Sequence, residues 1–189
     1  GEEFSHDPVM FLHGGGGGIA AGDFNGDGRM DLATAIVQSQ HRLGEPDPGY
    51  HGKIRYFLGR DAVTLFDTIP DLTLRGREME GLGFYVNERT SGILSLDYNG
   101  DGCSELLVMQ YNLDAYPSMR LAMYRGGAIL DSIPVAYVQA RKDIADQYFA
   151  DDIMIGDING DGDDDILVHG SYVASPVPAR VQYWDLHLG

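Results

Sequence analysis

A short acidic pattern that occurs three times constrains this sequence more than any other feature. The pattern D-x-N-G-D-G-x-x-[DE]-[LI] begins at Asp23, at Asp97 and at Asp157. Three copies with the same N-G-D-G centre indicate an internal repeat. Because each repeat normally folds as one unit that stacks on the next, the motif predicts a chain built from similar units.

Each copy of the pattern places oxygen atoms at alternate positions of a tight loop, where they can point at one centre. Ca²⁺ takes about 6–8 oxygen ligands in a flexible geometry. We predict three Ca²⁺ sites, each formed by the side chains at positions one, three, five and nine of the loop and by the backbone carbonyl at position seven. The predicted ligands are Asp23, Asn25, Asp27, Arg29 and Asp31 in the first loop, Asp97, Asn99, Asp101, Cys103 and Glu105 in the second, and Asp157, Asn159, Asp161, Asp163 and Asp165 in the third.

Two other interpretations of these loops are weaker. Asp-Gly and Asn-Gly pairs also mark ordinary turns, but a carboxylate at position nine of every copy favours metal binding. Without a cation, the carboxylates of each loop would repel one another. Mg²⁺ demands near-ideal octahedral geometry and keeps its waters, so Ca²⁺ suits these loops better.

The segments around the loops are typical of strands. An EF-hand needs a Glu at position twelve, between two helices, and this chain has Thr34, Val108 and Val168 there. The flanks, such as GILSLDY before the second loop and ELLVMQY after it, are short and apolar. Such runs, bounded by glycine and loop residues, indicate β-strands. Each loop is therefore expected to join two neighbouring antiparallel strands.

A strand, the D-x-N-x-D-G-x-x-D loop and a second strand together resemble the FG-GAP/VCBS-type repeat, a family that includes the propeller blades of integrin α-subunits. The resemblance implies that each repeat forms one four-stranded antiparallel blade of a β-propeller, with the calcium loop between its first two strands. The expected fold is all-β, with three such blades in a single domain over residues 1–189. The repeats are expected at approximately 15–70, 91–135 and 151–189.

The expected strands follow the apolar runs. They lie near 17–23, 31–38, 53–58 and 62–68 in the first repeat, near 92–98, 105–111, 119–125 and 128–134 in the second, and near 152–158, 165–172 and 179–187 in the third. The third repeat lacks a fourth strand, which an N-terminal strand at 7–14 could supply. Two segments lie outside this plan: 71–91, where LGFYV is a candidate strand, and 136–152, which has a helix-like polar pattern.

Three blades are too few to close a ring, since propellers use about 4–8. Blades left open would expose apolar faces. Two solutions are open: two chains pair into one ring, or further sequence or partner subunits complete it. The chain begins without Met, so we expect either a processed mature form or a fragment.

The composition excludes several classes of protein. The 189 residues include 29 acidic and 13 basic side chains, with a net charge of −16. This charge excludes a nucleic-acid surface, because phosphate binding needs a basic patch. No apolar run approaches the roughly 20 residues of a transmembrane helix. The single cysteine, Cys103, allows no intrachain disulfide.

The sequence contains no recognisable catalytic constellation. The motifs G-x-S-x-G, H-E-x-x-H, C-x-x-C and the P-loop are absent, so we expect no enzymatic activity. Cys103 lies inside a loop where its backbone is the useful group. His41 and His51 share one loop, and solvated histidines explain them better than a second metal. Three aromatic residues outside the strands are candidate platforms for sugar stacking, although covering loops is their commoner role: Tyr50, Tyr116 and Tyr148.

These observations predict a calcium-binding, non-enzymatic β-propeller module for protein–protein adhesion or assembly. Its partner is expected to be another protein or a second copy of the chain, in a homodimer or larger assembly. Because such loops suit millimolar calcium, the module is expected to be extracellular, periplasmic or on the cell surface. The alternatives are a carbohydrate-binding lectin with a glycan ligand, and a non-catalytic segment of a larger secreted enzyme.

Overall fold

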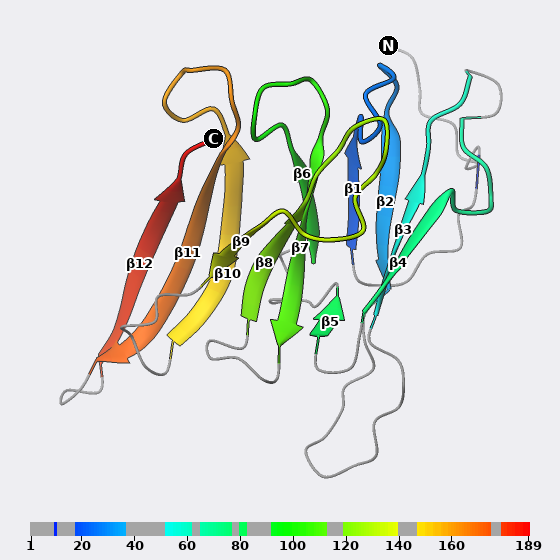
Figure 1. Cartoon of the computed structure of the whole chain (residues 1–189). Helices are drawn as coiled ribbons and strands as arrows, with labels where there is room; N and C mark the ends of the chain where they lie inside the picture. Colours follow the sequence, from blue (N-terminus) through cyan, green and yellow to red (C-terminus); the bar gives the residue numbers. More distant parts are fainter. Residues whose placement is uncertain are drawn as a thin grey trace, which may run out of the picture.

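The regular structure of this chain consists of three antiparallel β-sheets that lie side by side (Figure 1). The computed structural model describes residue 10 and residues 18–36, 52–61, 65–76, 80–82, 92–112, 119–139, 147–174 and 179–189. Within these ranges all regular elements are strands. No helix in this part of the chain is long and apolar enough to cross a membrane.

The first sheet has the order β1–β2–β3–β4, so each strand pairs with the next one in the sequence. Its strands are β1 (Gly18–Gly22), β2 (Asp31–Ile36), β3 (Lys53–Phe57) and β4 (Leu72–Arg75). Ala20, Ala33, Tyr56 and Leu72 lie opposite one another in register. Because directly opposed residues share a face of the sheet, this row forms part of one apolar surface.

The second sheet repeats this hairpin order and adds one short strand. It contains β6 (Ile93–Leu96), β7 (Glu105–Asn112), β8 (Met119–Tyr124) and β9 (Ala136–Gln139). The added strand β5 (Glu80–Leu82) pairs with the far end of β7, beyond the part that pairs with β6. The edge of the sheet beside β7 is therefore shared by two segments, β5 and β6.

The third sheet has three strands among the described residues: β10 (Gln147–Gly156), β11 (Asp165–Ala174) and β12 (Ala179–His187). The register of β10 against β11 shifts between Tyr148 and Asp152. Ala150, in the shifted part, has a φ of 58°. A register shift with a positive φ is the mark of a β-bulge or similar irregularity in this strand.

The second sheet is buried on both faces, which explains the unbroken apolar run of β7. Successive side chains of a strand point to opposite faces. Leu106 and Val108 pack toward the first sheet, in a core with Ala33. Leu107 and Met109 pack toward the third sheet, in a second core with residues such as Ile166. A strand with an apolar layer on each side needs no alternation of polar residues.

Backbone hydrogen bonds tie the three sheets together at the edge where the repeated loops lie. The Ser104 N–H donates to the Asp23 carbonyl at 2.8 Å, and the Asp164 N–H donates to the Asp97 carbonyl at 2.8 Å. The Ser95 hydroxyl also donates to the Ala21 carbonyl, at 2.6 Å. All three loops project from the same edge of the stack, the upper edge in Figure 1.

The predicted loop-and-strand pairs are present as β1–β2, β6–β7 and β10–β11, but the predicted fourth strands near 62–68 and 128–134 are wrong. Residues 65–68 and 128–134 are not strands, and the fourth strands are β4 and β9. The chain leaving the third strand first makes contacts outside its sheet, as shown by the Gly127 N–H, which donates to the Phe24 carbonyl at 2.8 Å. The fourth strand of each of these sheets therefore begins later in the sequence than predicted, after the connection that follows the third strand.

The helix-like pattern of 136–152 also gave a wrong prediction. β9 and the beginning of β10 occupy the described part of this segment. Along β9 only Val138 is buried, because this strand lies at the end of its sheet. The polar residues that suggested a helix are therefore the exposed side chains of this strand. The predicted strand at 7–14 lies outside the described residues except for Met10, and the LGFYV segment lies outside them beyond β5.

The sandwiched position of β7 leads to a first prediction. Leu107→Ala and Leu106→Ala should each lower the free energy of unfolding by about 2–5 kcal/mol, because each opens a cavity in a different core. Ile133→Ala is the control, since Ile133 is exposed and should change stability by no more than about 0.5 kcal/mol. Urea titrations measure all three. A small effect at either leucine would contradict burial of the second sheet on that face.

Candidate metal-binding loops

The three loops turn around the carboxylate at position one. Asp23 Oδ1 accepts hydrogen bonds from the Gly26 N–H at 2.8 Å and from the Asp27 N–H at 3.0 Å. Its second oxygen, Oδ2, accepts from the Gly28 N–H at 2.7 Å. In the third loop Asp157 accepts from the same three amides, and in the second loop Asp97 accepts from those of positions five and six. One side chain thus sets the curvature of each loop.

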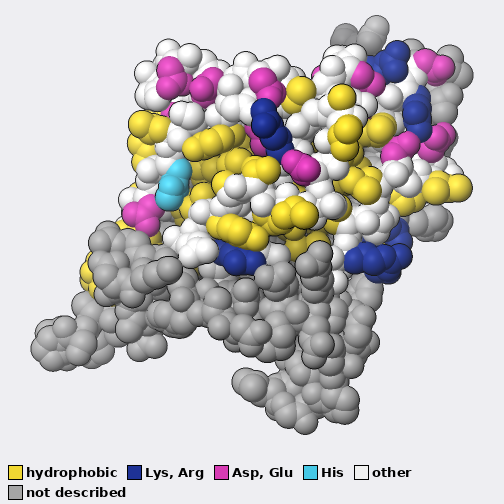
Figure 2. Space-filling model, viewed as in Figure 1, with side chains coloured by type: hydrophobic (Ala, Val, Ile, Leu, Met, Phe, Trp, Pro, Cys, Tyr) yellow, Lys and Arg dark blue, Asp and Glu magenta, His cyan; other side chains and the backbone are white. Residues whose placement is uncertain are grey.

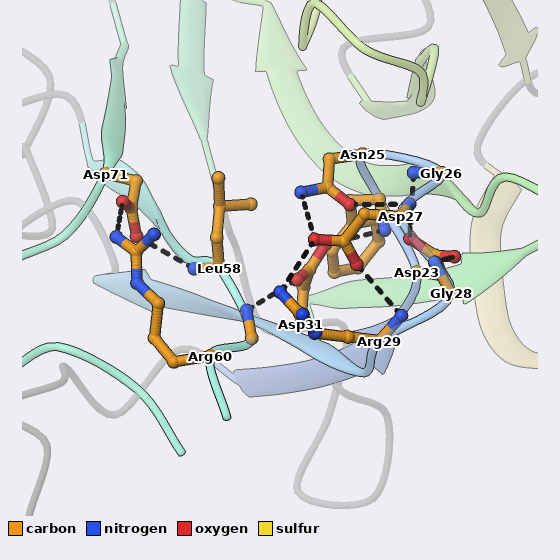
Figure 3. A network of polar contacts seen from close by, with 12 residues as sticks. Asp23, Asn25, Gly26, Asp27, Gly28, Arg29, Asp31, Leu58, Arg60 and Asp71 are labelled. Carbon is orange, nitrogen blue, oxygen red and sulfur yellow. Dashed lines mark hydrogen bonds and ion pairs between the residues drawn. The ribbon is translucent and has the colours of Figure 1, made fainter. Parts of the chain in front are cut away.

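The side chains at positions three and five lie on the inner wall of the same turn. Asn25 Oδ1 accepts from the Asp27 N–H at 3.0 Å, and Asp27 Oδ1 accepts from the Arg29 N–H at 2.9 Å. Figure 3 shows these groups converging with Asp23. The second and third loops repeat both bonds. The structure therefore brings together the predicted side-chain ligands of positions one, three and five.

Glycine at positions four and six makes this turn possible. Gly26 and Gly28 have φ values of 74° and 81°. Residues with a Cβ atom rarely adopt this left-handed region, whereas glycine does so at no steric cost. The four corresponding glycines of the other loops also have positive φ, between 64° and 102°.

The carboxylate at position nine lies beneath the loop and is buried in all three repeats. Asp31 Oδ2 accepts from the Phe24 N–H at 2.9 Å, and Asp31 Oδ1 accepts from the Gly59 N–H at 2.7 Å. Asp165 makes the same two bonds, to the Ile158 N–H at 2.8 Å and to the Gly189 N–H at 3.0 Å. Position nine therefore joins the start of the loop to the end of the third strand.

Glu105, the residue at position nine of the second loop, differs in one respect. Its Oε2 accepts from the Tyr98 N–H at 3.0 Å. Its Oε1 is buried without a hydrogen-bond partner among the described residues. Glu105 as a whole is only 1% exposed. A buried carboxylate oxygen without a close partner is energetically costly. The amide of Gly126, the residue equivalent to Gly59 and Gly189, still acts on this carboxylate and lowers its pKa, so the second repeat keeps the same pairing in a weaker form.

The pKa shifts at position nine follow from burial and from the amides. Burial raises the pKa of Asp31, and the amides of Gly59 and Phe24 oppose this rise. Burial likewise raises the pKa of Glu105, assisted by the negative charge of Asp101. The pKa of Asp165 is instead lowered, chiefly by the hydrogen bond from the Gly189 amide. In the first two loops the charged form is therefore disfavoured, and a nearby cation would favour it.

Sequence reasoning missed the glycine that follows each third strand. Gly59, Gly126 and Gly189 lie against the carbonyl of position eight of their own loop, so closely that a Cβ atom would clash at each. The third strands end at Phe57, Tyr124 and His187, so the glycine follows each strand by two residues. Aligning the repeats on their third strands would have found it.

A polar network fixes the chain that leaves β3, beside the first loop (Figure 3). The Leu58 N–H donates to Asp71 Oδ2 at 2.8 Å. The Arg60 guanidinium pairs with Asp71 at 2.6 Å and with Asp67 at 3.0 Å. Exposed ion pairs of this kind contribute about 0–1 kcal/mol, so the network positions the connection to β4 more than it stabilises the fold.

All fifteen predicted ligands lie in the described part of the chain. Their side chains do not form a complete coordination shell. Among the described residues, no group of three or more His, Cys, Asp or Glu side chains is arranged to hold a metal ion. Metal binding by the fifteen predicted ligands stays a prediction. The other candidates, His41, His51, Tyr50 and Tyr116, lie outside the described residues, as does the side chain of Tyr148.

A groove of about 400 Å³ lies between the first and second sheets, away from the loops. Its described lining includes Arg75, Gln110 and Tyr137, and contains no Asp, Glu, His or Cys. The Arg120 guanidinium donates to the buried Gln110 at 2.6 Å and stacks 4.0 Å from the centre of the Tyr137 ring. The described lining therefore offers no acid–base pair, and the repeated loops remain the better candidate site.

The fold and loops define a protein built from stacked antiparallel sheets, each with an oxygen-rich hairpin loop between its first two strands. A comparison with known families agrees with this class. The model of the FG-GAP repeat matches residues 15–36, which cover β1, the first loop and β2. The resemblance predicted from the motif is therefore confirmed for this segment. No curated protein matched the chain.

The buried position-nine carboxylate leads to a second prediction. In calcium-free buffer, Asp31→Ala should destabilise the chain by roughly 1–3 kcal/mol for each backbone N–H left without an acceptor. Asp31→Asn keeps one acceptor oxygen and should cost less. Asp131→Ala is the control, because Asp131 is exposed. Thermal and urea unfolding measure the effect, and equal stability of Asp31→Ala and the control would contradict a structural role for Asp31.

Proposed function

We propose that this chain is a calcium-stabilised β-propeller module that acts by binding protein partners rather than by catalysis. The observation that carries the proposal is the repetition of one oxygen-rich loop at the same edge of all three sheets. Each loop turns the oxygen atoms of positions one, three and five toward a common inner wall. The FG-GAP repeat matched at residues 15–36 supports the propeller class.

The residues present fit Ca²⁺ chemically. Every donor is an oxygen atom, as a hard cation requires. Each carboxylate has about four lone-pair sites, so the amide hydrogen bonds leave acceptor capacity. The groups that would hold the ion in each loop are the side chains of positions one, three, five and nine and the carbonyl of position seven.

The charge and chemistry of the surface support binding of proteins. A net charge of −16 disfavours nucleic acid and anionic membranes as partners. Acidic side chains gather along the loop edge in Figure 2, where bound cations would offset their repulsion. Loops with such ligands in extracellular modules bind calcium in the range of about 10⁻⁴–10⁻³ M. We therefore propose an extracellular, periplasmic or cell-surface location.

A third prediction tests each loop separately. The wild-type chain should bind three Ca²⁺ ions, and Asp27→Ala, Asp101→Ala and Asp161→Ala should each bind one fewer. Native mass spectrometry and calorimetric titration count the ions, with Asp131→Ala as the matched control. At free calcium about 100 times the dissociation constant, each site should add about 2.7 kcal/mol of stability. An unchanged ion count in the variants would overturn the proposed sites.

A further inference from the structure

The outer edge of the first sheet is formed by β4, which pairs with β3 alone among the described strands. The Gly76 N–H donates to the Gly52 carbonyl at 3.0 Å, on the side of β3. Because the backbone groups of an antiparallel strand point alternately to either side, those of Thr73 and Arg75 face the open edge. Among the described residues, no backbone hydrogen bond outside the β3–β4 ladder involves Thr73 or Arg75. An unpaired edge of this kind is a template for another strand.

The groove between the first and second sheets runs along this edge. It has a volume of about 400 Å³, and its described lining includes every residue from Leu72 to Gly76. Successive side chains of a strand point to opposite faces of the sheet. A groove confined to one face would therefore meet only alternate residues. Contact with an unbroken run of residues places the groove against the backbone edge of β4, where the unpaired groups lie.

The opposite wall of the groove is formed by β9 and the connection before it. It contains Ile133, Pro134 and Tyr137. Ile133 is 69% exposed, and Tyr137 is 42% exposed. The Arg120 guanidinium lies 4.0 Å from the centre of the Tyr137 ring, a contact that holds the ring in place. On the other side, Leu74 belongs to the core between the two sheets. A strand added to β4 would place alternate side chains between these two apolar walls.

The charge at this edge is opposite in sign to that of the chain. The net charge is −16, but the described lining of the groove contains no Asp or Glu and has a cation at Arg75. Arg75 is exposed, and it forms no ion pair with another described residue. Figure 2 shows Lys and Arg side chains along the lower border of the described residues, away from the loops. Because directly opposed residues of neighbouring strands interact, and opposite charges attract there, Arg75 favours an acidic partner.

We propose that an extended segment of a partner protein binds as an added outer strand of the first sheet, antiparallel to β4. The described strand pairs of this sheet are all antiparallel, so the added strand continues their pattern. Its backbone pairs with Thr73 and Arg75, and an acidic side chain lies opposite Arg75. Its apolar side chains enter the groove beside Leu74. In such additions main-chain hydrogen bonds supply affinity, and pockets for alternate side chains supply specificity. This inference rests on the proposed protein-binding function and names the class of partner.

The first test is calorimetric titration of the full chain, in calcium, with the peptide acetyl-Ser-Val-Glu-Val-Thr-Val-Ser-amide. In the proposed register its Glu lies opposite Arg75, and its valines lie on the groove side. We expect saturable binding of one peptide per chain. N-methylation of the Glu nitrogen removes a donor that faces β4 and should abolish binding. N-methylation of the valine after it is the matched control, because that N–H points away from β4. No binding of the parent peptide at millimolar concentration would overturn the inference.

A proline in β4 tests the same contact from the side of the chain. Thr73→Pro removes an N–H from the open edge and leaves the β3–β4 ladder intact, since edge strands tolerate proline where the missing N–H faces outward. It should raise the dissociation constant of the peptide by about fivefold or more. Thr73→Val is the matched control, because it changes the side chain, keeps the N–H and should bind like the wild type. Circular dichroism and urea titration check that both variants fold.

A charge exchange tests the register without altering the backbone. Arg75→Glu should weaken binding of the parent peptide by about fivefold or more. A peptide with Lys in place of Glu should bind this variant more tightly than it binds the wild type. Arg125→Glu is the control with the same change in charge, because Arg125 lies at the loop edge, where it pairs with Asp101 at 3.7 Å. Equal weakening by both substitutions would show a dependence on net charge alone and would overturn the assigned contact.

The calcium count separates this inference from the proposed function. A chain that binds three ions but not the peptide keeps the calcium-stabilised module and overturns the added strand. A chain that binds the peptide with the expected pattern, but binds no calcium, does the reverse. Peptide binding that tolerates both N-methylation at Glu and Thr73→Pro would place the peptide away from β4, and the inference would then be wrong.

Discussion

The buried carboxylate at position nine is the interaction on which each repeat depends. Asp31 and Asp165 each accept one amide from the start of their loop and one from the glycine after the third strand. Three strands and a loop are thereby fixed by one side chain. Burying a carboxylate is expensive unless hydrogen bonds compensate it, and the raised pKa values of Asp31 and Glu105, caused chiefly by burial, show that compensation is incomplete.

Backbone hydrogen bonds couple the loops of neighbouring sheets, and the Ser95 and Tyr98 hydroxyls add side-chain bonds between the same sheets. Ser104 and Asp164 lie at position eight, next to the residues that line the inner side of their loops. Their amides donate hydrogen bonds to the preceding loop. Any change in the curvature of one loop therefore moves the donor or acceptor of the next. The apolar layers on either side of β7 pack the three sheets against one another, and the loop contacts lie at one edge of these layers.

The sequence was most informative close to the motif. The strands β1, β2, β6, β7, β10 and β11 flank the loops directly, so apolar runs next to a fixed motif located them well. The fourth strands β4 and β9 are four residues long and follow long connections, so nothing local identifies their partners. The pattern at 136–139 looked helical because a terminal strand exposes most of its side chains. From the sequence, position nine was predicted only as a metal ligand. Its structural role could not be predicted, because its burial and its second amide donor depend on a glycine that is distant in the sequence.

The distribution of hydrogen bonds shows where a cation would matter most. Position nine already holds the hairpin to the third strand without any metal, and the apolar layers hold the sheets. The bonds of Asp23, Asn25 and Asp27, by contrast, stay within the loop itself and are exposed to water, where such bonds contribute little net stability. A cation there would act mainly on the loop edge. Because the contacts between neighbouring sheets at that edge run through positions seven and eight, metal binding would also order the contacts between neighbouring sheets.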